Sequence, residues 1–278
     1  MADNREILVS QDWAKQNLNN DDIRFVEVDV DTTSYNNGHI PGAVGWNWKS
    51  QLQDTLTRNV ASKEAIEKLL GDSGINKDTS IILYGDNNNW FAAWAYWLLK
   101  YYGHENLRIL DGGRKKWDAD GNELTTEVPN PKKENYIIGD IRKELRAFRS
   151  DVEQTLGNDY AFGLVDVRSP DEFTGKIIAP PGVKELSQRG GHIPGAKNIP
   201  WASTVNEDGT FKSTEELKKI YADHDITPDK AIIAYCRIGE RSAHSWFVLK
   251  ELLGFENVSN YDGSWTEWGN LINAPIER

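Results

Sequence analysis

The chain has 278 residues, which is enough for one large domain or two domains of ordinary size. Its 32 Lys and Arg residues against 43 Asp and Glu residues give a formal net charge of −11, which argues against nucleic acid and against an anionic membrane surface as partners. A single cysteine excludes an internal disulfide and favours a reducing compartment. The first residues form no secretory signal and no apolar stretch reaches transmembrane length, so we expect a soluble, cytoplasmic protein.

The first half of the chain contains a hexapeptide typical of a turn, Gly38-His39-Ile40-Pro41-Gly42-Ala43, and a strongly apolar run from Trp90 to Leu99. This run is too short to span a membrane and is typical of a core helix. A polar stretch with two prolines, residues 128–135, indicates a linker. We therefore expect an N-terminal domain over residues 1–128, a linker over 129–136 and a C-terminal domain over 137–278.

The second half of the chain repeats the first. The hexapeptide recurs at residues 191–196, an offset of 153, and residues 84–117 match residues 235–268 without gaps. Val28-Asp29-Val30 aligns with Val165-Asp166-Val167 at an offset of 137, which places about 16 extra residues between Phe173 and Gly191 in the second copy. A period near 150 residues is the size of a domain, so we expect two domains of one fold.

Strand and helix signals alternate along the second copy. Short apolar strands are expected at residues 163–167, 196–200, 231–235 and 258–261. Capping boxes at Ser169 and Ser213 predict two helix starts, and a third helix is expected from near Ser242 to about Leu253, before Gly254. This alternation predicts an α/β fold, with two tandem domains that each contain a mainly parallel sheet flanked by helices on both faces. In such sheets, ligands bind beyond the carboxyl ends of the strands.

One cysteine loop lies between a predicted strand and the third helix: Cys236-Arg237-Ile238-Gly239-Glu240-Arg241-Ser242. Loop N–H groups, the helix dipole and the two arginines all favour a thiolate at Cys236. A lone cysteine at a strand end is usually a small buried hydrophobic residue. However, two arginines and a glycine within five positions are difficult to place in a packed core. We therefore expect a reactive cysteine that handles an anionic group.

The first copy differs from the second at the same place. Gly85 stands at the position of Cys236 and is followed by Asp86-Asn87-Asn88-Asn89-Trp90, with no thiol and no arginine. We therefore expect the first domain to be catalytically inactive. Trp90 is interpreted as a core residue rather than as a substrate contact.

Tandem copies of the hexapeptide, with a Cys-Arg-x-Gly-x-Arg-Ser loop in the second copy alone, closely resemble the two-domain thiosulfate sulfurtransferases, or rhodaneses. The resemblance covers nearly the whole chain. Asp29 and Asp166-Val167-Arg168 also fit the family's pattern at the end of the first strand of each domain. The α/β fold of the family agrees with the alternation of strands and helices described above.

The resemblance implies a transferase that works in two half-reactions. The Cys236 thiolate attacks the outer sulfur of thiosulfate and expels sulfite, and the resulting persulfide passes its sulfur to cyanide or a thiol in ping-pong fashion. Arg237 and Arg241 are expected to bind the donor, while Ile238, Gly239, Glu240 and Ser242 supply the backbone of the loop. We expect Glu240 to point outward to solvent, because an inward carboxylate would oppose the thiolate. No cofactor or metal is expected.

The chain departs from two subgroups of the family. Mercaptopyruvate sulfurtransferases have a Cys-Gly-Ser-Gly type of loop, so Arg237 favours thiosulfate as donor here. Vertebrate-type thiosulfate enzymes end the loop with Val-Thr rather than Glu-Arg. They also place an arginine where this chain has Glu172, so their accessory basic residues do not transfer to it.

Several polar residues have a structural interpretation. His39 and His192 occur in both copies, including the one without a thiol, which favours a structural role in the turn over proton transfer. His244 is expected to pack or face solvent. Asp166 and Arg168 are expected to form a salt bridge that supports the loop, with substrate orientation as the alternative, and Asp171 and Glu172 are explained by helix-start electrostatics.

Other functions remain open from the sequence. One is a phosphatase or arsenate reductase on the same fold. Such enzymes place five residues between Cys and Arg, whereas this loop has four. Others are a mercaptopyruvate sulfurtransferase and a carrier that passes its persulfide to a protein partner. The sequence leaves the natural donor and acceptor and the oligomeric state undetermined.

Overall fold

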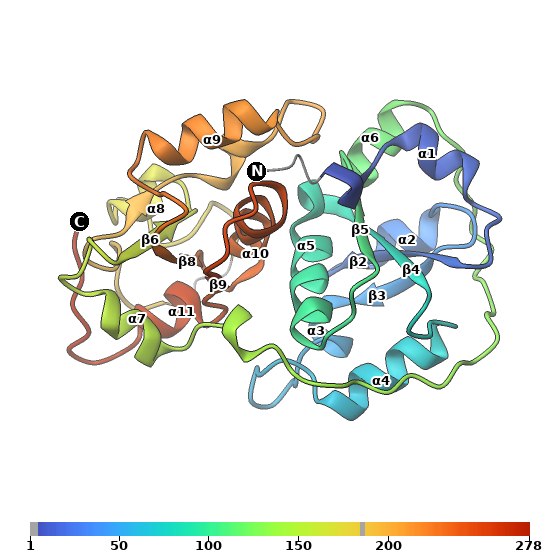
Figure 1. The fold of residues 1–278 in the computed structure, drawn as a ribbon, viewed down its shortest axis with the longest axis horizontal. Helices are drawn as coiled ribbons and strands as arrows, with labels where there is room; N and C mark the ends of the chain where they lie inside the picture. Colours follow the sequence, from blue (N-terminus) through green and yellow to red (C-terminus); the bar gives the residue numbers. More distant parts are fainter. Residues whose placement is uncertain (1–4, 184–186) are drawn as a thin grey trace. The chain divides into compact units, whose positions relative to one another are not determined.

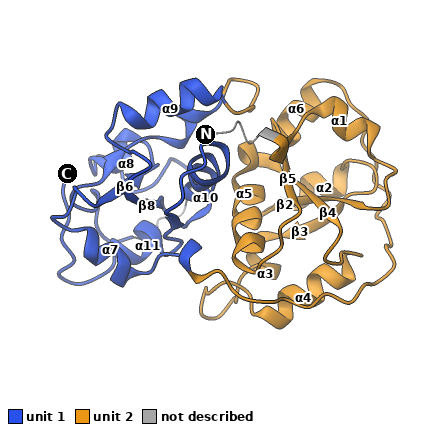
Figure 2. Ribbon diagram, in the orientation of Figure 1, with its two compact units in different colours: residues 1–4, 144–205, 212–278 blue, residues 5–143, 206–211 orange. Residues whose placement is uncertain are grey.

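The computed structural model describes residues 5–183 and 187–278, which form two compact units (Figure 2). The N-terminal unit contains residues 5–143 and 206–211, and the C-terminal unit contains residues 144–205 and 212–278. Residues 1–4, at the end tested for a secretory signal, and residues 184–186 of the expected insertion lie outside the described residues.

The N-terminal unit is built on a five-stranded sheet in the order β1-β5-β4-β2-β3, in which every neighbouring pair is parallel (Figure 1). The strands are β1 (Leu8–Val9), β2 (Ile23–Asp29), β3 (Val44–Asn47), β4 (Ser80–Tyr84) and β5 (Leu107–Leu110). The helices are η1 (Arg5–Ile7), α1 (Gln11–Gln16), α2 (Thr33–Asn37), α3 (Trp48–Gln51), α4 (Lys63–Asp72), α5 (Asp86–Tyr101) and α6 (Gly113–Ala119). The apolar run from Trp90 to Leu99 lies within α5, as its sequence predicts.

The C-terminal unit is built on a four-stranded parallel sheet in the order β7-β6-β8-β9. The strands are β6 (Phe162–Asp166), β7 (Lys197–Asn198), β8 (Ala231–Tyr235) and β9 (Val258–Asn260). The helices are α7 (Arg149–Thr155), α8 (Pro170–Phe173), α9 (Thr214–Ala222), α10 (Glu240–Phe247) and α11 (Ser264–Trp268), with the shorter helical segments η2 (Lys143–Leu145), η3 (Trp201–Thr204) and η4 (Val248–Leu252).

The two units share one topology, which confirms the predicted repeat. Reading the second sheet as β9-β8-β6-β7 gives the same order as β5-β4-β2-β3 in the first. The hexapeptide turn is held in the same way in each copy. The hydroxyl of Tyr84 accepts a hydrogen bond from the N–H of Ile40 at 3.1 Å, and the hydroxyl of Tyr235 accepts one from the N–H of Ile193 at 3.1 Å. The fold class predicted from the sequence is therefore confirmed.

The turn histidines are structural, as expected. His39 bonds the carbonyls of Tyr35 and Glu127 through its two ring nitrogens and stacks on the Tyr35 ring, with the two centroids 3.8 Å apart. His192 bonds the carbonyl of Phe173 and stacks on the Phe173 ring in the same manner. Both rings hold two segments of the turn together.

The helices around the cysteine loop begin and end within a few residues of the positions predicted from the sequence. Ser169 and Ser213 are the caps of α8 and α9. Helix α10 begins at Glu240, two residues before the expected start, because Gly239 takes a left-handed conformation with φ 99° and serves as the N-cap. The helical run ends in η4, and Gly254 follows with φ 70°.

One short segment belongs to a different unit from its neighbours in the chain. Residues 206–211 lie in the N-terminal unit, although residues 205 and 212 lie in the C-terminal one (Figure 2). The N–H of Phe211 donates to Asp111 Oδ1 at 2.9 Å, and Lys116 Nζ lies 3.4 Å from Asp208 Oδ2. The repeat pattern of the sequence does not predict that residues 206–211, here called the interdigitating segment, belong to the N-terminal unit.

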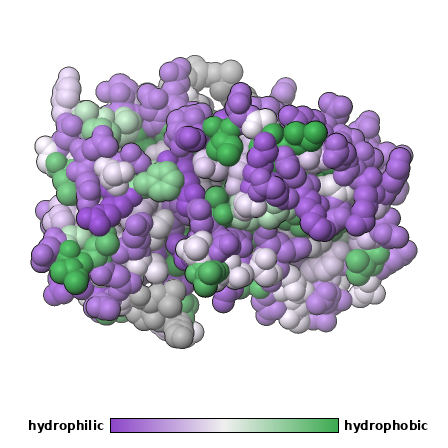
Figure 3. All heavy atoms as spheres, turned by 90° about the horizontal axis from the view of Figure 1, so that it is seen from below, coloured by the Kyte–Doolittle hydropathy of each residue, from purple (hydrophilic) through white to green (hydrophobic). Residues whose placement is uncertain are grey.

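The surface agrees with the high charge content of the sequence. On the face drawn in Figure 3, hydrophilic residues predominate and hydrophobic ones form small, separate groups. Across the described residues, no helix is long and apolar enough to cross a membrane.

Candidate active site

Cys236 lies directly after β8, in the centre of its sheet, and before α10. Both its backbone groups are bonded to the start of α11: its N–H donates to Ser264 Oγ at 3.1 Å, and its carbonyl accepts from the N–H of Trp265 at 3.0 Å. The cysteine is completely buried. The expected placement of the thiol beyond the carboxyl end of a strand is therefore present in the structure.

Two groups contact the sulfur directly. The N–H of Gly239 donates to Sγ at 3.1 Å, and the thiol donates to Glu240 Oε2 at 3.4 Å. The prediction that Glu240 points outward to solvent is wrong. Its side chain is only 4% exposed, because the first turn of α10 packs against the sheet and the helix start directs this carboxylate toward the sulfur.

The resting thiol is not stabilised as a thiolate. Burial raises the pKa of Cys236 above its usual range, and the charge of Glu240 raises it further. Arg241 and hydrogen bonding from Ser242 act in the opposite direction but do not compensate. The expectation that loop amides and arginines favour the thiolate is therefore wrong, because it omitted desolvation and the inward carboxylate.

The guanidinium of Arg241 forms a bidentate ion pair with the carboxylate of Glu172. Its Nη1 donates to Glu172 Oε2 at 3.0 Å and its Nη2 donates to Glu172 Oε1 at 3.1 Å. Burial alone would raise the pKa of Glu172, but hydrogen bonds and charge from Arg241 outweigh it, and the pKa lies below its usual value. Glu172 also accepts from Ser169 in the capping box at the start of α8.

Glu172 is a site residue that sequence reasoning explained as helix-start electrostatics. The capping box is present, so that explanation holds for the contact with Ser169. The contact with Arg241 also had a signal in the sequence, since Glu172 replaces an arginine of the vertebrate-type pattern. An acidic residue there indicates a partner of opposite charge, and that partner is Arg241.

Arg237 and Ile238 form the more accessible part of the loop. Both are partly exposed, whereas Gly239, Glu240, Arg241 and Ser242 are buried. The carbonyl of Arg237 accepts from the N–H of Thr266 at 3.0 Å and from its hydroxyl at 2.8 Å, which anchors the backbone of the loop. Arg237 is therefore more accessible than Arg241.

Asp166 and Arg168 form the expected salt bridge at the end of β6. Arg168 Nη2 lies 2.5 Å from Asp166 Oδ2 and also donates to the carbonyl of Gly191 at 2.7 Å. The guanidinium stacks over the ring of Trp265, 4.5 Å from its centroid. The backbone N–H of Trp265 donates to the carbonyl of Cys236, so the Asp166–Arg168 pair supports the loop through Trp265.

Two further contacts fix the shape of the loop and were not found from the sequence. Asn260 accepts from Ser242 Oγ at 2.7 Å and donates to the carbonyl of Gly239 at 3.2 Å. Asp262 is paired with Arg146 through two bonds of 2.9 and 3.2 Å, and a Cβ atom at Gly239 would lie 2.8 Å from its Cα. No sequence signal near Cys236 identifies these residues, because they follow another strand.

The corresponding loop of the N-terminal unit has no room for a side chain at its first position. A Cβ atom added to Gly85 would lie 2.5 Å from the carbonyl oxygen of Val28. Residues 87–89 then adopt left-handed conformations with φ between 52° and 64°, as asparagine tolerates. The side chain of Asp29, the counterpart of Asp166, accepts from the N–H of Asp86 at 2.9 Å, whereas Asp166 forms a salt bridge with Arg168.

His244 and Trp90 differ in their burial. His244 is completely buried, and its ring meets Trp201 edge to face with centroids 5.8 Å apart, so the packing interpretation is confirmed. Burial lowers the pKa of His244 to about 3. Trp90 is partly exposed at the start of the helical part of α5.

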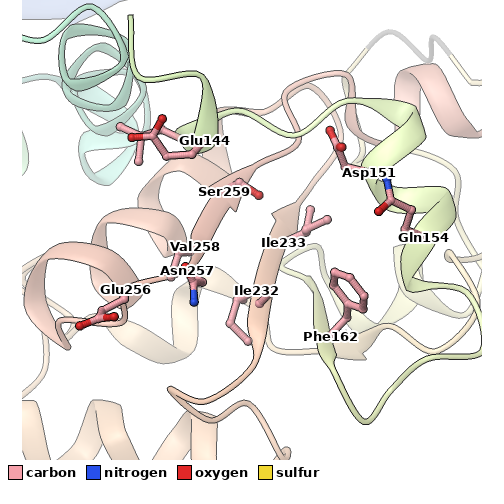
Figure 4. A pocket seen from close by; sticks show the side chains of 12 residues that line it. Glu144, Asp151, Gln154, Phe162, Ile232, Ile233, Glu256, Asn257, Val258 and Ser259 are labelled. Atoms are coloured by element: carbon pink, nitrogen blue, oxygen red, sulfur yellow. The ribbon is translucent and has the colours of Figure 1, made fainter.

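A hollow of about 200 Å³ lies at the opposite end of the same sheet (Figure 4). Phe162, Ile232 and Val258, at the amino ends of β6, β8 and β9, line it together with acidic side chains such as Glu144 and Glu256. Its described lining contains no thiol and no basic side chain. It is therefore separate from the cysteine loop.

Comparison with known proteins decides the family. The model of the Rhodanese-like domain matches residues 10–120 and 148–271. The chain belongs to the rhodanese family. A protein of Haloferax volcanii named "Putative thiosulfate sulfurtransferase" is 56% identical over 279 residues, covering 99% of this chain and 97% of that protein. The sulfur carrier protein TtuD of Thermus thermophilus is 50% identical over 276 residues, covering 98% and 97% of the two chains.

Solved structures resemble this rhodanese over nearly its whole length. A structure of EanB with a cysteine persulfide and ergothioneine matches with a TM-score of 0.86 at 26% identity, covering 99% of this chain and 71% of that one. YnjE matches with a TM-score of 0.85 at 27% identity, covering 98% and 68%. The family match and the named relatives place this rhodanese among sulfurtransferases.

Proposed function

We propose that the protein is a thiosulfate sulfurtransferase in which Cys236 carries the transferred sulfur as a persulfide. The observation that carries the proposal is the sulfur at the end of β8, contacted by the Gly239 N–H at 3.1 Å and set in a loop with two arginines. Membership of the rhodanese family and the names of its relatives support the same reaction.

The reaction proceeds in two half-reactions at one sulfur atom. In the first, the Cys236 thiolate bonds to the outer sulfur of thiosulfate while the S–S bond of the donor breaks and sulfite leaves with the electron pair. In the second, cyanide or a thiolate attacks the outer sulfur of the persulfide and the Cys236 thiolate is released. The N–H of Gly239 stabilises negative charge on the sulfur in both steps.

The two arginines divide the binding of the donor between them. Arg237 is partly exposed and meets the sulfonate group as it arrives. Arg241 is buried, 3.6 Å from Glu240 and bidentate to Glu172, so it acts as a fixed charge beside the sulfur. Asp166 and Arg168 support the loop through Trp265.

The roles of the two domains follow from the same proposal. The C-terminal domain carries the chemistry, and the N-terminal domain is inactive, because Gly85 leaves no room for a nucleophilic side chain. We further propose a cytoplasmic location, where a reducing environment keeps Cys236 as a thiol.

The test combines turnover with mass measurement. Purified protein is incubated with thiosulfate alone and its intact mass is recorded, and thiocyanate formation is then followed after cyanide is added. An adduct of about +32 Da that cyanide removes, with thiocyanate released, supports a covalent persulfide intermediate. Absence of both the adduct and turnover contradicts thiosulfate as donor.

A persulfide carrier is the second candidate, and the Arg241–Glu172 pair favours it. Glu172 already compensates the buried guanidinium, which leaves less net positive charge for a dianionic donor. The sulfur carrier protein of Thermus thermophilus is 50% identical. Under this alternative, thiosulfate and mercaptopyruvate give slow, unsaturable loading, whereas a low-molecular-weight persulfide loads Cys236 completely.

A further inference from the structure

Glu240 occupies an unusual position for a carboxylate beside a sulfur nucleophile. Its Oε2 accepts from the Cys236 thiol at 3.4 Å, and its Oε1 lies 3.6 Å from Nε of Arg241. The side chain is only 4% exposed, so water does not solvate it freely. A buried carboxylate costs free energy unless its charge is compensated, and here one oxygen faces a cation and the other faces a thiol.

Asp262, which follows β9 and packs against Gly239, is already paired with Arg146 at 2.9 Å. The other charges around the sulfur come from three elements. Helix α10 supplies Glu240 and Arg241, helix α8 supplies Glu172, and the loop supplies Arg237, which is partly exposed. The buried part of this set already holds two carboxylates and one guanidinium. Loss of the thiol proton to solvent would add a third negative charge in a desolvated place, whereas movement of that proton to Glu240 leaves the local charge unchanged.

We propose that Glu240 is the proton acceptor for Cys236, so that the thiol and the carboxylate hold one proton between them. This role rests on the proposed sulfurtransferase function and assigns the residue that activates its nucleophile. The S–H bond breaks with its electron pair kept on sulfur, and the proton moves to Oε2 of Glu240. The thiolate then attacks the donor as described, and the thiolate released by the acceptor takes the proton back.

A shared proton has a distinctive signature in pH dependence. Two coupled groups titrate in two steps that belong to the pair, and between these steps the fraction of thiolate is constant. A thiol without a coupled carboxylate titrates in one step, and below it the thiolate falls tenfold for each unit of pH. A carboxylate that only repels the thiolate also produces a plateau, but its replacement by Gln should not slow alkylation at low pH. Slower alkylation of Glu240→Gln at low pH is therefore the result that distinguishes a proton acceptor, and equal or faster alkylation there overturns the proposal.

The experiment measures the rate at which iodoacetamide alkylates Cys236 between pH 5 and pH 10. The measured alkylation rate belongs to Cys236, because the chain has one cysteine. We expect two steps with a plateau in the wild-type protein and one step in Glu240→Gln, which is slower than wild type at low pH and faster at high pH. Glu256→Gln, an acidic residue at the far end of the sheet, serves as the control and should keep two steps.

Each outcome decides the role of Glu240 independently of the sulfur donor. A single step in the wild-type protein overturns the proposal even if Glu240→Gln fails to fold, and so does an unchanged two-step profile in that variant. Alkylation needs no thiosulfate. A two-step profile that depends on Glu240, with slower alkylation of Glu240→Gln at low pH and no thiocyanate formation, would retain the proton acceptor and refute thiosulfate as donor.

Discussion

Glu172 and Arg241 form a buried, bidentate ion pair between the first turns of α8 and α10, with both N···O distances between 3.0 and 3.1 Å. The pair fixes the guanidinium beside Cys236 but also compensates its charge. Because each partner would be costly to bury alone, the pair links the stability of the C-terminal domain to the electrostatics of its loop.

Glu172→Gln is expected to destabilise the protein and at the same time to improve binding of thiosulfate. Removal of the carboxylate leaves Arg241 buried without its counter-charge, which should lower the free energy of unfolding by about 3 kcal/mol. The released positive charge should lower KM for thiosulfate. Urea unfolding and steady-state kinetics measure the two effects. Glu216→Gln is the matched control, since Glu216 closes the same type of capping box in α9 without an arginine partner. An unchanged KM would show that Arg241 does not contact the donor.

Arg241→Ala is expected to raise KM for thiosulfate and to destabilise the protein, because it leaves Glu172 buried and unpaired. Combination with Glu172→Gln should recover roughly 1–3 kcal/mol of stability, as expected for residues that interact directly. The combined variant should keep the high KM. If stability losses were simply additive, the energetic coupling of the two residues would be refuted.

Cys236→Ser is expected to abolish sulfur transfer, with activity falling by about three orders of magnitude or more, because the sulfur is the only nucleophile in the mechanism. Folding should be retained, since serine occupies less volume at the same position. Circular dichroism and intact mass after thiosulfate treatment provide the measurements. Turnover in this variant would refute the persulfide mechanism.

Gly239→Ala tests the conformation of the loop. Gly239 has φ 99°, and an added Cβ atom would lie 2.8 Å from Cα of Asp262, so alanine should shift the N–H that contacts the sulfur. We expect a loss of about 2 kcal/mol of stability and a fall in kcat of about tenfold or more. Gly157→Ala is the matched control, because Gly157 also has positive φ but no atom within 4 Å of the added Cβ. Equal effects in both variants would exclude the contact with Asp262 as the cause.

Asp29→Asn is expected to stabilise the protein increasingly as pH rises. Burial, together with Asp86 and Glu27, raises the pKa of Asp29 from 3.8 to about 8 in the folded state. Between these values the folded state binds more protons than the unfolded state, so the stability of the wild-type protein falls with rising pH in this window.

The variant removes this dependence and should gain roughly 1–3 kcal/mol at pH 8, with little gain at pH 4. Thermal unfolding at several pH values gives the comparison. The exposed Asp31→Asn variant should keep the pH dependence of the wild-type protein. A gain from Asp29→Asn that is independent of pH would contradict the titration of this carboxyl group.

The sequence predicts those parts of the site that depend on local pattern. The apolar run before Cys236 and the glycine after it are sufficient to place the thiol between a strand and a helix. The repeat of the hexapeptide predicts that both units share one topology. Both predictions depend on backbone preferences and periodicity, which act over a few neighbouring residues.

Side-chain partners distant in the sequence could not be predicted in this way. Glu172 and Arg241 are separated by 69 residues, and only the tertiary fold brings their side chains together. The direction of Glu240 depends on where α10 begins, and a shift of two residues in that start changes which side chains face the sheet. The prediction of a thiolate was wrong for the same reason, because desolvation depends on the finished packing.

The interdigitating segment at residues 206–211 has a consequence for attempts to divide the protein. A cut in the linker separates this segment from Asp111, the residue that accepts its Phe211 N–H. An N-terminal fragment made this way lacks residues 206–211, which belong to its compact unit. The two units of this duplicated chain are therefore not two contiguous segments, and a single cut does not separate them cleanly.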